Sequence, residues 1–366
     1  LLLEEAMQAG AFGLSTGLIY APQVYAKTDE IIELAKIVAK YNGLYFSHIR
    51  SEGYDIVNAV KELIEIVEKS GCIGGHIAHH KISGRKYWGT SKETLSVIEE
   101  ANERGLSITF DQYPYTRGMT GLVATLPSWA QEGGPEKILE RLKDSKERER
   151  IKNDVLNSDI NWENWIREVG FENIFVTYAG SEKWKGIDGK SITEITKMKG
   201  MIDEWETYFE LLIDENIVVQ ITIEGMGEED IRRIMKNRYQ MVGTDGLGVP
   251  LLKDKQISHP RFYGVYPRVI SKYVKEEKIL TLEEAIRKMT SFPAQRLGIK
   301  DRGVLIEGTW ADVVIFDYNR IRDKATYEEP NQFCEGIKYV MVNGKMVVEN
   351  EKQKIKSPGK VIRQPY

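Results

Sequence analysis

Segments with a helical period and short strand-like segments alternate along most of the chain. Apolar residues recur every three to four positions in seven segments, which predicts helices over residues 28–41, 55–70, 90–104, 134–156, 204–215, 227–237 and 281–290. Compact apolar runs lie between them, and these predict strands at 12–20, 44–50, 75–81, 107–115, 217–224 and 241–245. Helices that alternate with short apolar strands favour βα units and a parallel sheet.

Several of the predicted strands are apolar at the start and polar at the C-terminal end. The runs "LYFSH", which ends at His48, and "LSITFD", which ends at Asp111, show this pattern. In a (β/α)8 barrel the C-terminal ends of the strands form the mouth, where ligands bind. We therefore predict an α/β fold, a (β/α)8 TIM-type barrel of the metal-dependent hydrolase type over residues 1–302.

Two stretches interrupt the barrel rhythm. Residues 117–217 form a connection longer than an ordinary crossover, so we expect an insertion on the mouth side of the barrel. After Gly303 the sequence changes to short alternating strands broken by glycines and an Asn-Gly turn. This change predicts a small C-terminal β-domain over residues 303–366.

Charge, apolar run length and cysteine content limit the partners and the location that we expect. The net charge of −4 over 366 residues, without a basic tract, argues against nucleic acid and anionic membranes as partners. No apolar run approaches the ~20 residues of a transmembrane helix. Only two cysteines are present, which suits a reducing compartment, and we expect a cytoplasmic protein. A small-molecule substrate is the expected partner, and the sequence leaves the oligomeric state open.

The histidines are concentrated in one place. Three of the five lie within "GHIAHHK", at the end of one predicted strand, while His48 ends the strand before it and Asp245 ends a later one. Imidazole nitrogens and a carboxylate from separate strands at one face are the ligands that zinc accepts. Zinc lowers the pKa of a bound water to ~7, and a nearby carboxylate can carry the proton to a leaving nitrogen. The pattern therefore predicts a divalent-metal site.

The spacing alone does not decide which histidine binds. Successive side chains of a strand point to opposite faces, so His79 and His80 cannot both point into the barrel, whereas His76 and His80 share a face. A single histidine at a strand end is more often a hydrogen-bonded structural residue, and Asp-Gly is usually a turn. The prediction depends on the co-occurrence of these signals.

Specific motifs then indicate a family. The segments "GAFGLSTGLIYAP", "SHIRSEG", "HIAHHKISGRKYWG", "DQYPYT", "GTDG", "HPRFYGVYPRVI" and "MTSFPAQRLGIKDRGVLIEGTWADVVIFD" together run over nearly the whole chain. They resemble the N-acyl-D-amino-acid deacylases (D-aminoacylases) of the amidohydrolase superfamily. The resemblance implies metal-dependent hydrolysis of the amide bond of N-acyl-D-amino acids, with one or two divalent ions, normally zinc.

The resemblance also implies roles for individual residues. It assigns the metal to His48, His79 and Asp245, and gives Asp245 the role of general base and then acid. His76 would pack or hydrogen-bond on the other face. Charge-assisted hydrogen bonds would hold the substrate carboxylate. The matching positions for that group are Tyr20, Lys81, Tyr113 or Tyr115, and Arg261.

The sequence departs from the family pattern at its start. The family has a His-x-His pair on its first barrel strand and a cysteine ligand further along, and neither is found here. We therefore expect an N-terminally truncated chain that lacks the first barrel strands. Two alternatives remain open: a cyclic-amide hydrolase of the dihydroorotase or hydantoinase type, and a non-catalytic barrel with an incomplete metal site.

Overall fold

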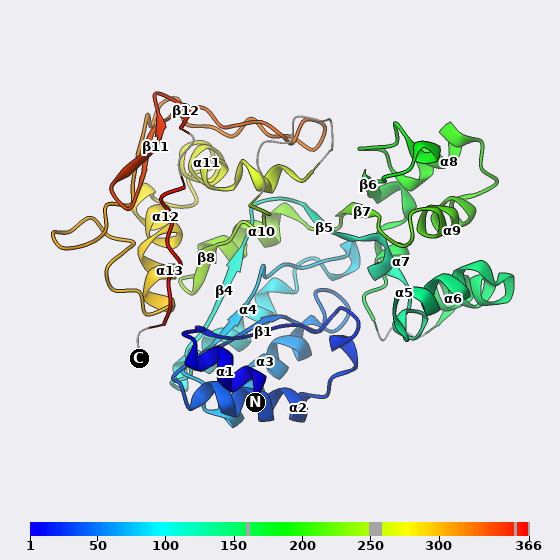
Figure 1. Cartoon of the computed structure of the whole chain (residues 1–366), viewed down its shortest axis with the longest axis horizontal. Coiled ribbons are helices and arrows are strands. Elements are labelled where there is room, and N and C mark those ends of the chain that lie inside the picture. Colours follow the sequence, from blue (N-terminus) through cyan, green and yellow to red (C-terminus); the bar gives the residue numbers. More distant parts are fainter. Residues whose placement is uncertain (159–161, 249–257, 355–356, 365–366) are drawn as a thin grey trace.

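A five-stranded parallel sheet forms the centre of the computed structural model, which describes residues 1–158, 162–248, 258–354 and 357–364. The strand order is β1-β2-β3-β4-β8, and neighbouring strands run parallel (Figure 1). The strands are β1 (Gly13–Gly17), β2 (Leu44–His48), β3 (Gly75–Ile77), β4 (Ile108–Gln112) and β8 (Gln240–Val242). The expectation of parallel βα units is confirmed for these segments.

Amphipathic helices cover this sheet. They are α1 (Leu2–Gln8), α2 (Thr28–Ala39), α3 (Ile56–Ser70), α4 (Ser91–Glu103) and α10 (Glu228–Lys236). Helix α3 shows why they form: Ile56, Val60, Leu63 and Val67 recur at helical spacing and are all buried. The helix ends at Gly71, whose φ of +76° is a left-handed conformation that glycine adopts without strain. One apolar core therefore joins the helices to the sheet.

The sheet is open in the described part of the chain. Strands β1 and β8 each pair with one neighbour only among the described strands. The prediction of an eight-stranded closed barrel is therefore confirmed only in part: the described residues form five parallel strands with covering helices.

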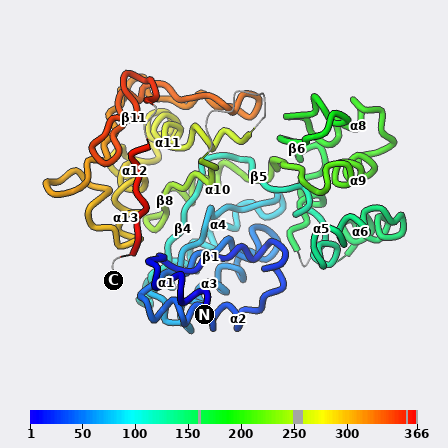
Figure 2. Tube along the Cα trace, in the orientation of Figure 1, coloured from blue at the N-terminus to red at the C-terminus, as the bar shows by residue number. Residues whose placement is uncertain are grey.

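Residues 117–224 form a separate lobe, visible in green on the right of Figures 1 and 2. It contains an antiparallel sheet in the order β5-β7-β6 and several helices around their own apolar core. The strands are β5 (Arg117–Gly121), β6 (Ile174–Tyr178) and β7 (Gln220–Glu224). The helices are α5 (Gly134–Lys143), α6 (Ser145–Asn157), α7 (Trp165–Val169), α8 (Ile192–Lys199) and α9 (Glu204–Asp214). The predicted insertion is thus a folded lobe with its own sheet.

One predicted strand belongs to a different sheet from the one expected. The segment 217–224 was expected among the parallel strands, and this is wrong. Strand β7 pairs antiparallel with both β5 and β6. The physical reason is that Ile221 and Ile223 on β7 are buried in the core of the lobe, so the apolar residues that suggested a barrel strand serve the insertion.

The C-terminal part returns to the central sheet and then forms a second antiparallel sheet. Its helices are α11 (Val265–Arg268), a π-helical continuation (Val269–Glu276), α12 (Leu282–Met289) and α13 (Ser291–Arg296). The sheet has the order β12-β11-β10-β9. Its strands are β9 (Val313–Phe316), β10 (Ile337–Val342), β11 (Lys345–Glu349) and β12 (Lys352–Gln353). Asn343 and Gly344 join β10 to β11 with φ values of +50° and +74°, the turn that the Asn-Gly pair predicts.

Among the described residues, none of the helices combines the length and the apolar character needed to cross a membrane.

Candidate active site

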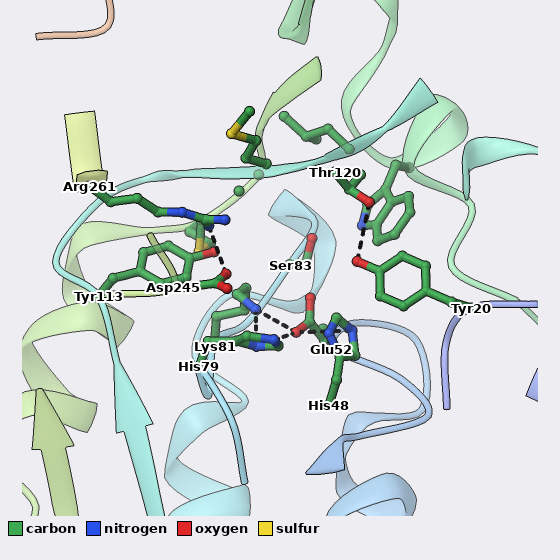
Figure 3. Close-up of a pocket in the computed structure, with 16 residues that line it drawn as sticks. Tyr20, His48, Glu52, His79, Lys81, Ser83, Tyr113, Thr120, Asp245 and Arg261 are labelled. Carbon is green, nitrogen blue, oxygen red and sulfur yellow. Dashed lines mark hydrogen bonds and ion pairs between the residues drawn. The ribbon is translucent and has the colours of Figure 1, made fainter. Parts of the chain in front are cut away.

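A cavity of about 180 Å³ lies where the C-terminal ends of the central strands meet the insertion. Side chains from the central sheet's loops and from the insertion line it. They are Tyr20, His48, Glu52, His79, Lys81, Ser83, Tyr113, Gly118, Met119, Thr120, Trp165, Ile223, Gly225, Met226, Asp245 and Arg261 (Figure 3). The strand ends meet at one side of a parallel sheet, which is where α/β proteins bind their ligands.

Two histidines and a glutamate form a compact group in this cavity. His48 is the last residue of β2, and His79 lies in the turn after β3. Glu52 lies four residues after His48, in the loop between β2 and α3. One possible ligand atom from each of the three lies within 4.8 Å of the others. The His48 and His79 ring centroids are 4.4 Å apart. This spacing allows one cation to touch all three side chains.

The turn after β3 brings His79 into position. His79 has a φ of +38°, and its backbone N–H donates to Asp111 Oδ1 at 3.1 Å. Asp111, in β4, is itself held by His76, whose Nε2 lies 2.8 Å from Asp111 Oδ2. Burial alone would raise the pKa of Asp111, but the His76 hydrogen bond and charge hold it below its ordinary value. His76 therefore supports the turn from the strand behind it.

The three clustered histidines thus have different surroundings. His76 is buried between Thr109 and Asp111, and His80 is buried with its Nε2 3.0 Å from Thr94 Oγ1. Of the three, only His79 is among the lining residues of the cavity. The expectation that His76 hydrogen-bonds away from the site is confirmed, and the structure separates His79 from His80.

The residues of the group fit a divalent cation. Burial holds the pKa of His48 well below its ordinary value, so the imidazole is neutral at pH 7. His48 Nε2 is buried and has no hydrogen-bond partner among the described atoms. A buried neutral nitrogen without a partner, beside a second imidazole and a carboxylate, is a donor set that zinc accepts.

Lys81 lies at the centre of this group. Its Nζ lies 2.5 Å from Glu52 Oε1 and 2.7 Å from His79 Nδ1. Burial would raise the pKa of Glu52, but the Lys81 ammonium, followed by His48 and His79, holds it well below its ordinary value. Glu52 is therefore a buried carboxylate at neutral pH, balanced by a buried ammonium.

A second ion pair lies across the cavity. Asp245, just beyond β8, has Oδ2 2.9 Å from Arg261 Nη1. The Asp245 side chain is 39% exposed, whereas Arg261 is 6% exposed. Asp245 is not one of the three residues whose ligand atoms share the 4.8 Å group. It lines the cavity as a partly exposed carboxylate, a type of group that can act as a general base and acid.

The tyrosines named from the sequence lie in different places. Tyr20 and Tyr113 line the cavity. Burial raises the pKa of Tyr20 to about 12, and its hydroxyl accepts a hydrogen bond from Thr120 at 3.2 Å. The Tyr113 ring lies below both cations, 5.5 Å from Lys81 Nζ and 4.7 Å from Arg261 Cζ.

Tyr115 is buried outside the cavity lining. Its hydroxyl donates to Pro260 O at 3.4 Å, and its ring packs edge-on against His259 and Tyr327. The structure therefore places Tyr113, rather than Tyr115, beside the cations.

Glu52 is a site residue that reasoning from the sequence missed. It stands four residues after a strand-end histidine, in "SHIRSEG", and a carboxylate so close to that histidine was the available signal. Glu163 of the insertion was missed too. Its Oε1 accepts the backbone N–H groups of Glu52 and Gly53 at 2.8 and 3.3 Å, which ties the insertion to the loop that carries Glu52.

Comparisons with known proteins point to one group of enzymes. An amidohydrolase family model matches residues 206–348. N-acyl-D-glutamate deacylase of Alcaligenes xylosoxydans xylosoxydans is 32% identical over 362 residues, which cover 99% of this chain and 63% of that protein. D-aminoacylase of the same organism is 31% identical over 350 residues, covering 96% and 61%. The chain thus spans less than two thirds of the length of these curated relatives.

A solved structure has a similar fold. The crystal structure of N-acyl-D-glutamate deacylase from Bordetella bronchiseptica, complexed with zinc and a phosphonate inhibitor, superposes with a TM-score of 0.75 at 32% identity. The match covers 94% of this chain and 61% of that one. The resemblance seen in the motifs is confirmed, and the chain is an amidohydrolase-family relative of the N-acyl-D-amino-acid deacylases.

Proposed function

We propose that the protein hydrolyses the amide bond of N-acyl-D-amino acids, releasing a carboxylate and a free D-amino acid. The observation that carries the proposal is the meeting, in one cavity, of a buried His–Glu–His group with two cationic side chains and a solvent-accessible aspartate. The His–Glu–His group holds a metal, the two cationic side chains bind a carboxylate, and the aspartate moves a proton. Relatives at 31 to 32% identity carry the names of deacylases of this class.

The metal-binding part of the site is His48, Glu52 and His79. A zinc ion, or a pair of divalent ions with Asp245 as a further ligand, would supply Lewis-acid and water-activating chemistry at this place. Neutral His48 offers a lone pair, and the Glu52 carboxylate lowers the net charge of the group once the ion is bound. Lys81 must then leave the centre, because its ammonium lies within contact distance of both Glu52 and His79.

Released Lys81 and Arg261 bind the α-carboxylate of the substrate. Each is a buried cation whose partner is an acidic side chain of the same cavity, so a substrate carboxylate can replace that partner. Hydrogen bonds between ionised groups are the strong ones. Tyr113 supports both cations with its ring face, and Tyr20 closes the cavity on the other side (Figure 3).

Asp245 carries the proton. Once Arg261 turns to the substrate carboxylate, Asp245 accepts a proton from the attacking water and then donates it to the departing nitrogen. The amine leaves as a neutral group, and the acyl product keeps the oxygen of the water. The main alternative, a cyclic-amide hydrolase, would use the same groups on a substrate that need not carry a free α-carboxylate.

The wider architecture is also part of the proposal. We infer that residues 1–302 belong to a (β/α)8 barrel, which further strands close at the open edges of β1 and β8. The open sheet and the greater length of the relatives support this. The two free cysteines, Cys72 and Cys334, support a reducing, cytoplasmic location.

The test uses the protein at the full length its gene encodes, loaded with zinc. N-acetyl-D-methionine, N-acetyl-L-methionine, dihydroorotate and hydantoin are assayed with the wild type, Asp245→Asn and the control Asp301→Asn, which changes an exposed aspartate. The proposal is supported if the wild type turns over only the D-substrate. It also requires that Asp245→Asn lowers this turnover by a factor of at least ~100 and that Asp301→Asn does not. Turnover of a cyclic amide instead, or no turnover of any of the four, contradicts it.

A further inference from the structure

The cavity has two chemically different walls, and the second wall has no role in the proposed reaction. The strand ends supply the histidines, the acids and the two cations. The insertion supplies Met119 and Thr120 from β5, Trp165 from α7 and Ile223 from β7, with Met226 just beyond β7. None of these five carries a charge, and the Thr120 hydroxyl donates to Tyr20. The side chain and the acyl group of a substrate have to contact this wall, because the α-carboxylate takes the cations.

The charges of the cavity balance with one bound carboxylate. Among the described lining residues, the permanent cations are Lys81 and Arg261. Lys81 lies 2.5 Å from Glu52, and Arg261 lies 2.9 Å from Asp245. Both cations thus already face an acid, and the proposed reaction uses both on the α-carboxylate. A second carboxylate on the substrate would find no free cation among these residues.

A nearby arginine is not available for that second carboxylate. Arg117 stands at the start of β5, two residues before Met119, but it is absent from the cavity lining. Its guanidinium pairs with Glu224 at 2.9 Å. Its Cζ also lies over two rings, 3.8 Å from the Phe175 centroid and 4.3 Å from the Tyr327 centroid. These contacts hold the charge away from the cavity.

The two methionines of this wall can accommodate substrates with apolar side chains of different shapes. Methionine is unbranched and polarisable, so it adapts to partners of different shape. Met226 is buried, while Met119 is half-buried, which leaves it room to move. A wall of two methionines, an isoleucine and an indole buries an aliphatic or thioether side chain favourably, whereas a carboxylate placed there would lose its hydration without a further cation among the described lining residues.

We infer that the preferred substrates are N-acyl-D-amino acids with neutral, apolar side chains, such as methionine or leucine, and that N-acyl-D-glutamate and N-acyl-D-aspartate are poor substrates. This inference rests on the proposed function. Sequence similarity does not decide this preference, because relatives named N-acyl-D-glutamate deacylase, D-aminoacylase and N-acyl-D-aspartate deacylase are 32%, 31% and 31% identical to this chain.

The experiment compares kcat/KM of the zinc-loaded, full-length protein for N-acetyl-D-methionine, N-acetyl-D-leucine, N-acetyl-D-glutamate and N-acetyl-D-aspartate. We expect the neutral substrates to be favoured by at least ~100-fold, since burying a carboxylate without a counter-charge is costly. Met119→Arg adds a cation to the apolar wall, and the ratio should move toward glutamate by at least ~10-fold. Met198→Arg is the matched control, because Met198 is half exposed on α8 in the insertion and does not line the cavity.

The outcomes distinguish failure of the inferred substrate preference from failure of the proposed function. Equal or faster turnover of the acidic substrates overturns the inference and leaves the proposed function standing. A ratio that moves equally in Met119→Arg and Met198→Arg also overturns it, because the wall would then have no part in selection. No turnover of any of the four substrates contradicts the proposed function, and the inference falls with it.

Discussion

The ion pair between Glu52 and Lys81 gives a sharp test of the site before any metal is added. Both side chains are 8% exposed, and the two charged atoms are 2.5 Å apart. Glu52→Gln keeps the shape of the side chain and removes its charge, so the Lys81 ammonium remains buried without a counter-charge. Removing one partner of a buried pair costs about 3–5 kcal/mol.

A matched exposed pair supplies the control. Lys69 and Glu65 are also 2.5 Å apart, but their side chains are 56% and 45% exposed. Glu65→Gln therefore makes the same chemical change in water, where an ion pair contributes about 0–1 kcal/mol. Urea unfolding of the chelator-treated protein at pH 7, followed by circular dichroism, gives the free energy of unfolding of each variant.

The double variant Glu52→Gln/Lys81→Met completes the test. Since a buried pair replaced on both sides by uncharged groups is often neutral in stability, the double variant should recover most of the loss seen in Glu52→Gln. The reasoning is refuted if Glu52→Gln costs no more than Glu65→Gln. It is equally refuted if adding Lys81→Met deepens the loss, because Lys81 would then not be the group left uncompensated.

Two further predictions concern neighbouring groups. Burial raises the pKa of Glu163 from 4.5 to about 7, so its contribution to stability is present below about pH 4.5 and is lost as the pH rises through 7. The unfolding free energy of the wild type relative to Glu163→Gln should fall by roughly 3 kcal/mol between pH 4.5 and pH 8, measured by urea titration, and parallel curves would contradict this. Tyr113→Leu should lower kcat/KM about 10-fold, because it removes the ring face beside Lys81 and Arg261, while Tyr115→Phe should change it less than about 3-fold. Equal losses would place Tyr115 in the site.

The sequence predicted the parts of the fold that local patterns determine. The strand end at His48 was found because an apolar run followed by polar residues marks the mouth of a βα sheet. The strand expected over residues 75–81 is shorter, because β3 ends at Ile77 and the chain turns at His79 with a positive φ. The Asn343-Gly344 turn was found because the pair prefers positive φ. The strand at Gln220–Glu224 was located, yet assigned to the wrong sheet, because period and composition do not say which partner an apolar strand will meet.

The site was predicted in part for a related reason. His48 and His79 were named as ligands, and the structure brings them together. Glu52 lies in a loop, where no period constrains the direction of a side chain, so only the folded chain shows that it lies against both histidines. The two tyrosines around Pro114 could not be separated by sequence either. Tyr113 lines the cavity and Tyr115 packs behind it, a difference that depends on the backbone at the strand end.

Metal binding by the His48–Glu52–His79 group tests the central claim most directly. The full-length protein and the variants His48→Ala, His79→Ala and Asp301→Asn are stripped with chelator, reloaded with zinc and passed through a desalting column. Zinc per chain is then measured by elemental analysis, with circular dichroism as the check that each variant is folded. We predict at least one zinc per chain in the wild type and in Asp301→Asn, and a loss of that zinc in folded His48→Ala and His79→Ala. Zinc content that is unchanged in both histidine variants would contradict the assignment of this cavity as the metal site.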